Sequence, residues 1–301
     1  MFFKKYLGEY RRVKGYRLDP WNAFEVENVF YESNNKTIVH PFNFKFRRKK
    51  VYGIIGPAGS GKSTLAAHFN GLIKSPKGNI YYFNGENIYF FKKTIPNFRK
   101  IRRSIGMVLQ NPEYQLFKST VLEDVCCGLE MLSIDTDNPE EKAKEKLREL
   151  GISDEFFDRN PFMLSGGQKK KVALAGILVI DSEIIIFDEP VLGLDPTSVQ
   201  KIVEIIKDLK EQNKTIIVIS NNIDLILELS EELLVMDRGR LIMSGKPYRI
   251  FRDKRLNLGT PKIIEFIEKL VKSSEKFAKI WNYEPKNYYE LSDAILNVLR
   301  K

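Results

Sequence analysis

Short runs of apolar residues along the chain predict buried β-strands. Runs of this length, bounded by turn or helix signals, are typical of strands that are covered on both faces. They cover residues 51–55, 105–109, 184–187, 215–220 and 233–236. Because α/β folds place their chemistry at the carboxyl ends of such strands, the residues that follow each run are the first candidates for a functional site.

A second set of segments predicts an antiparallel β subdomain. Residues 42–46 alternate apolar and polar positions like a half-buried strand, whereas His40-Pro41 just before them favours a loop. Further strands are expected at residues 24–31 and 78–83, whereas residues 241–244 are expected to pair back on the strand at 233–236. The turns between strands are expected at Asn34-Asn35-Lys36, Asn84-Gly85 and Arg238-Gly239.

Helix signals separate the strands. Thr120-Val121-Leu122-Glu123 is a capping box, and Asn138-Pro139 starts a helix that ends before Gly151. These two helices are expected to form a smaller helical subdomain. Residues 261–279 carry an apolar stripe and predict one amphipathic helix. The remaining helices are expected at residues 64–70, 169–179, 198–211 and 288–299.

The strand at residues 51–55 runs directly into a glycine-rich loop that fits G-x-x-x-x-G-K-[ST]. The loop consists of Gly56, Pro57, Ala58, Gly59, Ser60, Gly61, Lys62, Ser63 and Thr64. Its glycines let backbone N–H groups turn inward toward anionic oxygens, and the following helix N-terminus adds positive charge. In this motif Lys62 reaches the β- and γ-phosphates, and the Ser63 hydroxyl binds Mg²⁺. The loop therefore predicts binding of a nucleoside triphosphate with Mg²⁺.

Composition and charge narrow the class of protein. A chain of 301 residues can hold one large domain and a small one. The net charge of +10 suits nucleic acid or an anionic membrane face, and residues 1–20 form a basic N-terminal tail. No apolar run reaches the roughly 20 residues of a membrane span, and the N-terminus lacks a secretory signal. The adjacent Cys126 and Cys127 argue against a disulfide framework or a zinc site.

Three further motifs identify the class of P-loop protein. Leu164-Ser165-Gly166-Gly167-Gln168 lies downstream of the P-loop. The strand at residues 184–187 then ends in Asp188-Glu189-Pro190, and Gly193-Leu194-Asp195 follows. This order resembles the ATPase domain of ABC proteins, in which the LSGGQ signature is the discriminating motif. The resemblance implies an α/β fold: a P-loop NTPase core of ABC-ATPase type with an antiparallel β subdomain, a helical subdomain and a small C-terminal helical extension.

The resemblance implies a role for each matching residue, with ATP as the nucleotide. Asp188 would hold Mg²⁺ through water, and Glu189 would act as general base toward the attacking water. Gln110, which ends the strand at residues 105–109, matches the glutamine that reaches Mg²⁺ and that water. Tyr31 stands where an aromatic side chain stacks on adenine, with Phe30 as the alternative.

The signature implies that the protein works in a pair. Ser165, Gly166, Gly167 and Gln168 open a helix whose backbone N–H groups suit a γ-phosphate. In ABC ATPases this helix start completes the nucleotide site of the facing subunit, and Asp195 would lie at the interface. One polypeptide therefore supplies two half-sites and needs a second ATPase subunit, identical or different.

One position departs from the pattern of the family. ABC ATPases place a switch histidine directly after the strand that corresponds to residues 215–220, and this chain has Asn221 there. Asparagine can donate and accept hydrogen bonds, but it cannot carry a proton as imidazole does. The P-loop is expected to bind nucleotide with asparagine at this position. An alternative to full activity is that the nucleotide site at the P-loop of this chain hydrolyses ATP only weakly.

Shorter strings narrow the resemblance to the ATPases of energy-coupling factor (ECF) transporters, closer to the second of their two paralogous subunits. The matching strings are residues 111–117, Pro161-Phe162 and residues 168–178. The match covers roughly residues 22–300 and implies an ABC ATPase domain at 21–247 and a helical dimerisation region at 248–301. The family implies uptake of a vitamin or trace metal. A transmembrane coupling protein would dock near Gln110 to Phe117 and move a membrane-embedded substrate-binding subunit.

The sequence leaves other functions to be weighed. The protein is expected at the cytoplasmic face of the cell membrane, as a peripheral subunit. An ABC protein acting on nucleic acid or the ribosome would fit the charge of +10. Such proteins usually carry tandem ATPase domains or a coiled-coil insertion, whereas this chain has one P-loop and one signature. No nucleic-acid partner is therefore expected, and the transported substrate is not encoded in the chain.

Overall fold

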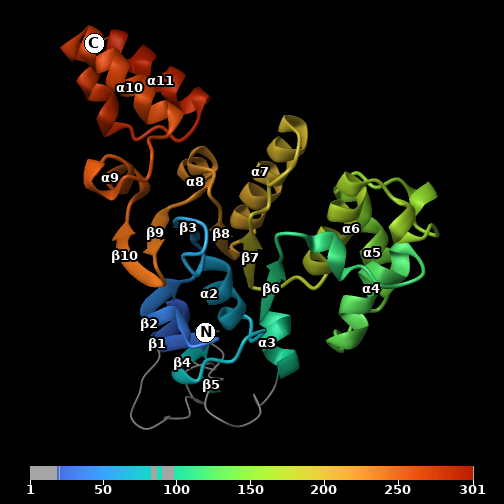
Figure 1. Cartoon of the computed structure of the whole chain (residues 1–301). Helices are drawn as coiled ribbons and strands as arrows, with labels where there is room; N and C mark the ends of the chain where they lie inside the picture. The colour runs from blue at the N-terminus through green and yellow to red at the C-terminus, as the bar shows by residue number, and fades with distance from the viewer. Residues whose placement is uncertain (1–18, 20, 83–86, 90–97, 301) are drawn as a thin grey trace, which may run out of the picture.

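Two β-sheets organise the part of the chain that the structure describes. The computed structural model describes residues 19, 21–82, 87–89 and 98–300. Its strands form a six-stranded sheet in the order β10-β9-β3-β8-β7-β6 and a four-stranded sheet in the order β2-β1-β4-β5 (Figure 1). Most of the basic tail expected at residues 1–20 and the turn expected at Asn84-Gly85 lie outside the described residues.

The six-stranded sheet confirms the buried strands expected from the apolar runs. Its strands are β3 (Val51–Ile55), β6 (Ile105–Val108), β7 (Ile184–Asp188), β8 (Thr215–Ile219), β9 (Glu232–Asp237) and β10 (Arg240–Gly245). All neighbouring pairs are parallel except β9 and β10. Because β8 lies between β3 and β7, the chain that leaves β8 emerges between the ends of those two strands.

The four-stranded sheet is the expected antiparallel subdomain. Its strands are β1 (Asn22–Ser33), β2 (Lys36–Arg47), β4 (Lys77–Tyr82) and β5 (Asn87–Tyr89). The ring of Phe24 stacks on that of Phe46 with centroids 4.4 Å apart, and both rings contact Phe69 of α2 (Lys62–Phe69). This aromatic cluster attaches the subdomain to the helix that follows the P-loop.

The prediction of a loop at His40-Pro41 is wrong, because both residues lie inside β2. β2 is an edge strand of its sheet, and Pro41 is exposed. Proline lacks the N–H group that an inner strand would have to donate, but an edge strand tolerates it. The strand therefore begins before the alternating segment at residues 42–46.

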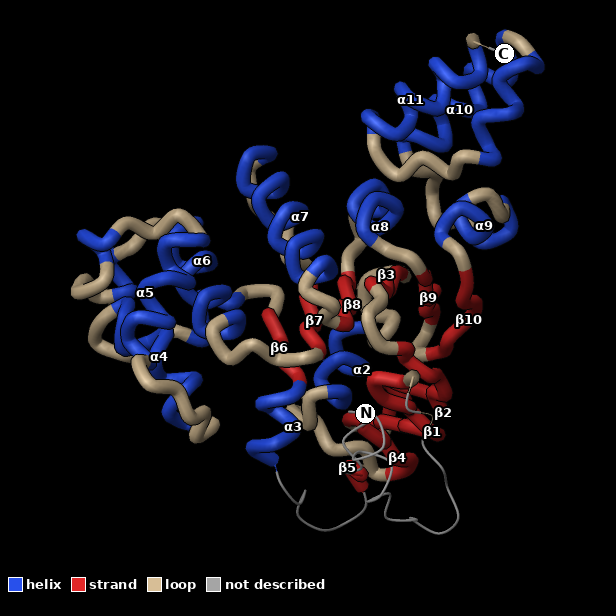
Figure 2. The backbone as a smooth tube through the Cα atoms, turned by 180° about the vertical axis from the view of Figure 1, so that it is seen from behind, coloured by secondary structure: helices blue, strands red, loops and turns tan. Residues whose placement is uncertain are grey.

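Helices flank the six-stranded sheet and build a separate helical subdomain. Near the sheet lie α2, α3 (Phe98–Ser104), α7 (Pro196–Glu211), α8 (Ile223–Leu229) and α9 (Pro247–Phe251). The helical subdomain holds α4 (Val121–Met131), α5 (Pro139–Glu149), α6 (Gly166–Leu178) and the short helices η1 (Pro112–Gln115), η2 (Asp154–Phe156) and η3 (Pro161–Met163). Figures 1 and 2 show it beside the β6 edge of the sheet. The caps expected at Thr120 and Asn138 are confirmed.

The C-terminal helices stand apart from the two sheets (Figure 1). They are η4 (Lys254–Leu256), α10 (Lys262–Ser273), η5 (Glu275–Asn282) and α11 (Tyr288–Leu299). The prediction of a single helix at residues 261–279 is wrong, because the backbone of Ser274 is extended (φ −160°, ψ 127°) and ends α10. The break lets Ile280 of η5 become fully buried in the core that also contains Ile263 and Ile267. None of the described helices is long and apolar enough to cross a membrane.

Candidate active site

The glycine-rich loop connects β3 to α2 and opens toward the N-terminus of that helix. Gly61 is the N-cap of α2 with φ of +91°, and a Cβ atom there would lie 2.7 Å from the carbonyl oxygen of Ile38. Only glycine fits both restrictions. The turn between β9 and β10 supports the loop, since the N–H of Gly239 donates to the carbonyl of Ser60 at 3.0 Å. Within the described residues no side chain caps the start of α2, and N–H groups at such a helix start suit an anion.

Lys62 is folded into the loop. Only 7% of its surface is exposed, and its ammonium donates to the carbonyls of Gly56 at 2.7 Å and Pro57 at 3.0 Å. Burial lowers the pKa of this ammonium, while the charges of Glu189 and Asp188 raise it. An ammonium held within this loop, at the start of α2, suits the oxygens of a phosphate chain.

Ser63 and Asp188 meet across the sheet. The Ser63 hydroxyl at the start of α2 donates to Oδ1 of Asp188, at the end of β7, over 3.1 Å. Asp188 is almost fully buried, and burial raises the pKa of its carboxyl group. A hydroxyl and a carboxylate side by side are the oxygen ligands that Mg²⁺ prefers. The residues present therefore fit a magnesium ion beside the phosphate loop.

Glu189 is held by three consecutive residues at the end of β8. Its backbone N–H donates to the carbonyl of Ile219 at 2.8 Å. Its carboxylate accepts from the Ser220 hydroxyl at 3.0 Å and from the Asn221 backbone N–H at 2.9 Å. The structure thus brings Glu189 and Asn221 together, through the backbone of Asn221. Ser220 was missed by the sequence analysis, because only the strand order places it beside Glu189.

The signature residues lie away from the P-loop of the same chain. Ser165 is the N-cap of α6 and accepts from the Gln168 N–H at 3.3 Å, while the Gln168 side chain accepts from the Ser165 N–H at 3.0 Å. Gly166 and Gly167 are exposed, and a Cβ atom at either would meet no atom within 4 Å. Figures 1 and 2 both show α6 in the helical subdomain, far from α2. The helix start faces open space.

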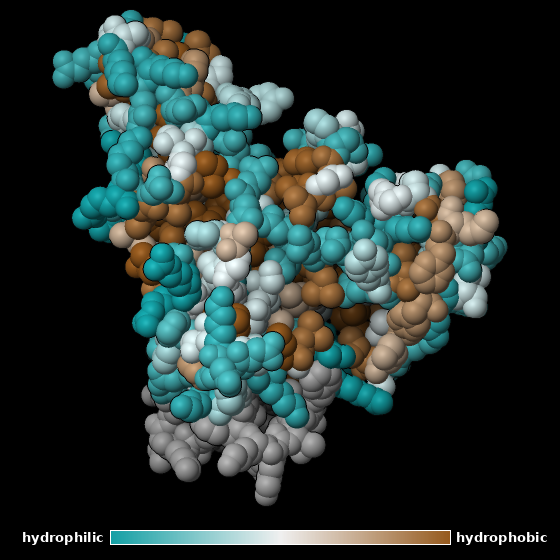
Figure 3. All heavy atoms as spheres, viewed as in Figure 1, coloured by the Kyte–Doolittle hydropathy of each residue, from teal (hydrophilic) through white to brown (hydrophobic). Residues whose placement is uncertain are grey.

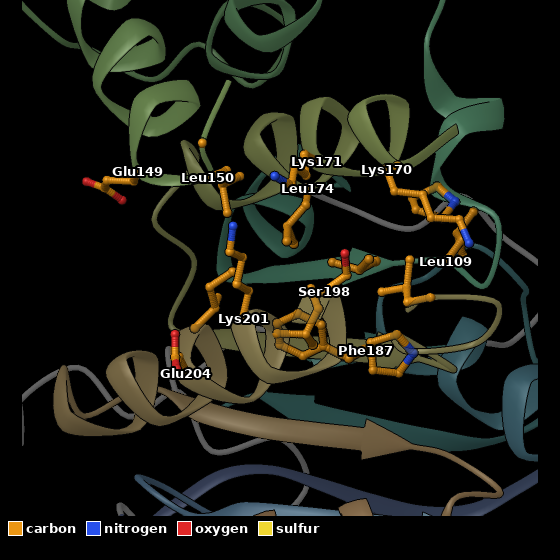
Figure 4. Close-up of a pocket in the computed structure, with 18 of the residues that line it drawn as sticks. Leu109, Glu149, Leu150, Lys170, Lys171, Leu174, Phe187, Ser198, Lys201 and Glu204 are labelled. Carbon is orange, nitrogen blue, oxygen red and sulfur yellow. The ribbon is translucent and has the colours of Figure 1, made fainter. Parts of the chain in front are cut away.

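Gln110 and Gly167 line a cavity between the helical subdomain and the core. The cavity measures about 280 Å³. Figure 4 shows Lys171 and Leu174 of α6 on one side of it and Ser198 and Lys201 of α7 on the other. It lies beside the signature helix, which packs against β6, near the point where Gln110 follows that strand.

The remaining predicted residues have contacts of their own. Asp195 caps α7, accepting from the Ser198 N–H at 3.0 Å and the Ser198 hydroxyl at 2.6 Å, and these hydrogen bonds lower the pKa of its carboxyl group. The ring of Tyr31 meets that of His68 on α2 edge-on, with centroids 5.1 Å apart. The ammonium of Lys77 lies over the ring of Phe30. An adenine-stacking role for Tyr31 therefore stays a prediction.

Known proteins are similar to this chain in sequence. The family model of the ABC transporter matches residues 39–192. The chain is 40% identical to the energy-coupling factor transporter ATP-binding protein EcfA2 of Mycoplasma pneumoniae, covering 91% of this chain and 93% of that protein. It is 36% identical to the energy-coupling factor transporter ATP-binding protein EcfA of Methanocaldococcus jannaschii, covering 82% of this chain and 89% of that protein.

Solved structures agree with the sequence relatives. The cbiO1 protein from Clostridium perfringens, part of the ABC transporter complex cbiONQ, has a TM-score of 0.67 at 32% identity and covers 85% of this chain and 96% of its own. A dimeric ATP-binding cassette in a post-hydrolysis state with ADP and Pi has a TM-score of 0.67 at 27% identity, with coverages of 74% and 98%. The chain belongs to the ABC transporter ATPases and, within them, to the ATP-binding proteins of energy-coupling factor transporters, of the EcfA2 type.

Proposed function

We propose that this ATPase binds ATP at its own P-loop and hydrolyses it in a pair with a second ATPase subunit, driving uptake of a vitamin or trace metal through membrane partners. One observation carries the proposal. Lys62 and Ser63 in the first turn of α2 converge on Asp188 at the end of β7, with Ser63 and Asp188 3.1 Å apart. This convergence joins a phosphate-binding loop to a metal-binding carboxylate.

Ser63 and Asp188, together with Gln110, are the residues that would hold Mg²⁺. When bound, the ion supplies positive charge to the phosphate oxygens as the phosphoryl group is transferred. Lys62 would exchange its carbonyl partners for phosphate oxygens, because an ammonium forms stronger hydrogen bonds with anions than with neutral groups. Glu189 would take the proton of the attacking water as general base.

The exposed signature supports a pair of ATPase subunits. Ser165 to Gln168 present a helix N-terminus to open space rather than to the P-loop of the same chain. We propose that this surface completes the nucleotide site of the second subunit and that Asp195 lies at the interface. Residues 21–247 would form the ATPase domain, and residues 248–301 would help the two subunits to pair.

A cluster of exposed side chains around α6 supports docking to the membrane partner. Tyr114 on η1 and Phe117 just beyond it are 84% and 61% exposed, and Phe162 and Met163 on η3 are exposed too. Both η1 and η3 pack against α6, and Figure 3 shows hydrophobic surface over this part of the molecule. Exposed apolar groups that gather in one area mark interaction surfaces. The coupling protein would dock here, which holds the ATPase at the cytoplasmic membrane face.

Replacement of Lys62 tests the nucleotide site. In the purified transporter complex, Lys62→Ala should weaken binding of a fluorescent ATP analogue to this chain, because a direct phosphate contact is lost. The exposed Lys269 on α10 provides the control, since Lys269→Ala removes the same charge far from the loop. Equal affinity in the Lys62→Ala and Lys269→Ala complexes would rule out the P-loop site.

A second candidate is a subunit that binds ATP but hydrolyses it slowly at its own site. The observation that favours it is Asn221, whose side chain cannot shuttle a proton. Asn221→His should then raise the rate of phosphate release by the complex. An unchanged rate would favour a fully active site with Asn221 as a tolerated substitution.

A further inference from the structure

Ser220 occupies the position next to both the switch residue and the predicted base. It follows β8, and none of its surface is exposed. Its hydroxyl donates to Oε2 of Glu189 at 3.0 Å and accepts from the backbone N–H of Asn222 at 3.1 Å. A buried hydroxyl with both a donor and an acceptor partner has a fixed orientation.

The bond from Asn222 decides where the hydroxyl hydrogen points. Because a lone pair of the Ser220 oxygen accepts the Asn222 N–H, the hydrogen of the hydroxyl is left for Glu189. Oε1 of the same carboxylate accepts the Asn221 N–H. The two carboxylate oxygens are therefore bound by different donors, which fixes both the position and the rotation of the carboxylate plane.

The backbone of Glu189 needs such support. Its φ of +50° lies in the left-handed region that non-glycine residues seldom adopt. Its N–H group is tied to the carbonyl of Ile219, so the end of β8 holds Glu189 at both its backbone and its side chain. Strained residues of this kind persist only where surrounding contacts hold them.

We propose that Ser220 is a positioning residue that aims the carboxylate of Glu189, a role that rests on the proposed function of Glu189 as general base. Both hydrogen bonds of the hydroxyl are made within the chain, to Glu189 and from Asn222, so its effect on hydrolysis would pass through Glu189. Asn221 contributes through its backbone N–H, which any residue except proline provides. The chain can therefore lack a histidine at position 221 and still hold its base in place, but it cannot lack a hydroxyl at position 220.

The test is hydrolysis at the P-loop of this chain in the assembled complex. All complexes carry Ser165→Arg, which disables the site that this signature completes, so the remaining single-turnover hydrolysis of radiolabelled ATP belongs to this chain. Ser220→Ala should lower that rate about ten- to hundredfold, the effect of losing one oriented hydrogen bond to a charged group, with little change in ATP affinity. Ser220→Thr keeps the hydroxyl and should retain most of the rate.

Ser182→Ala is the matched control. Ser182 is also a buried serine next to a core strand, but its hydroxyl has no hydrogen-bond partner within the described residues. Removing it should leave the rate unchanged. In a Glu189→Gln complex, Ser220→Ala should cause no further loss, because its effect is transmitted only through Glu189.

Different results would overturn different parts of the proposal. A Ser220→Ala rate equal to that of the Ser182→Ala control, with Glu189→Gln inactive, would leave the base assignment standing and refute the positioning role. Full activity of Glu189→Gln would refute the base assignment and the positioning role with it. A raised ATP dissociation constant for Ser220→Ala with an unchanged rate would also refute positioning.

Discussion

The hydroxyl of Ser63 lies 3.1 Å from Oδ1 of Asp188, although 125 residues separate the two along the chain. Ser63 lies at the start of α2, which follows β3, and Asp188 ends β7. β3 and β7 are not neighbours, because β8 runs between them. The contact arises because α2 starts over the end of the sheet, where the phosphate loop and the carboxylate of β7 meet.

Removing the Ser63 hydroxyl should change how binding of the ATP analogue depends on the Mg²⁺ concentration. Ser63→Ala deletes one proposed oxygen ligand, so the Mg²⁺ concentration that half-saturates binding of the ATP analogue should rise at least roughly tenfold. Binding without Mg²⁺ should change little. Ser244→Ala, at an exposed position of β10, is the control. An Mg²⁺ dependence equal to that of wild type would exclude Ser63 as a ligand.

The two cysteines should be unreactive in the folded protein. Burial, with smaller effects from the charges of Glu140 and Glu130, raises the pKa of the Cys126 thiol to about 11 from its ordinary 9.0, and burial also raises the pKa of Cys127. At pH 8 the thiolate fraction of Cys126 falls about 100-fold, and alkylation should slow accordingly. Mass spectrometry after iodoacetamide treatment, with the urea-unfolded chain as reference, measures this.

The same pKa shift predicts a pH dependence of stability. The folded state holds the Cys126 proton more tightly than the unfolded state does. The contribution of the Cys126 thiol to the free energy of unfolding is therefore complete below pH 9 and is lost as the pH rises toward 11. Cys126→Ser should weaken this alkaline loss. Alkylation of folded and unfolded chains at equal rates would contradict both the low reactivity of Cys126 and the pH dependence of stability.

How much the sequence could predict depends on the range of the interactions. The succession of strand, glycine-rich loop and helix at residues 51–69, the cap at Thr120 and the buried strands rest on neighbouring residues, and the structure confirms them. The break at Ser274 was not predicted, because it depends on where Ile280 packs in three dimensions. The contact between Ser220 and Glu189 depends on β8 lying beside β7, and no local pattern specifies strand order.

The C-terminal helices should be dispensable for folding of the ATPase core but needed for pairing. Their polar contacts with the rest of the chain include the Lys262 N–H, which donates to Asp224 at 2.7 Å, and the Tyr248 hydroxyl, which donates to the Pro285 carbonyl. Truncation before Leu256 should leave nucleotide binding intact and weaken association of the subunits. Unchanged association in analytical ultracentrifugation would refute the pairing role.

Replacing the proposed base should separate ATP binding from hydrolysis. Glu189→Gln keeps a side chain of the same shape that cannot accept a proton from water at neutral pH. The variant should bind ATP with near wild-type affinity and hold the pair of subunits closed. Size-exclusion chromatography with ATP should show a stable pair, and phosphate release as fast as wild type would exclude Glu189 as the base.

The central claim is that this chain supplies half of each of two nucleotide sites, its P-loop to one and its signature to the other. Steady-state phosphate release by reconstituted complexes with Ser165→Arg or Lys62→Ala tests it most directly. If the second subunit carries the switch histidine, Ser165→Arg should nearly abolish turnover, a loss of the order of 10²–10³ for one oriented contact. Lys62→Ala should cost less, because the site with Asn221 contributes less. Wild-type turnover by the Ser165→Arg complex would contradict shared sites, and equal losses from both changes would contradict the asymmetry between them.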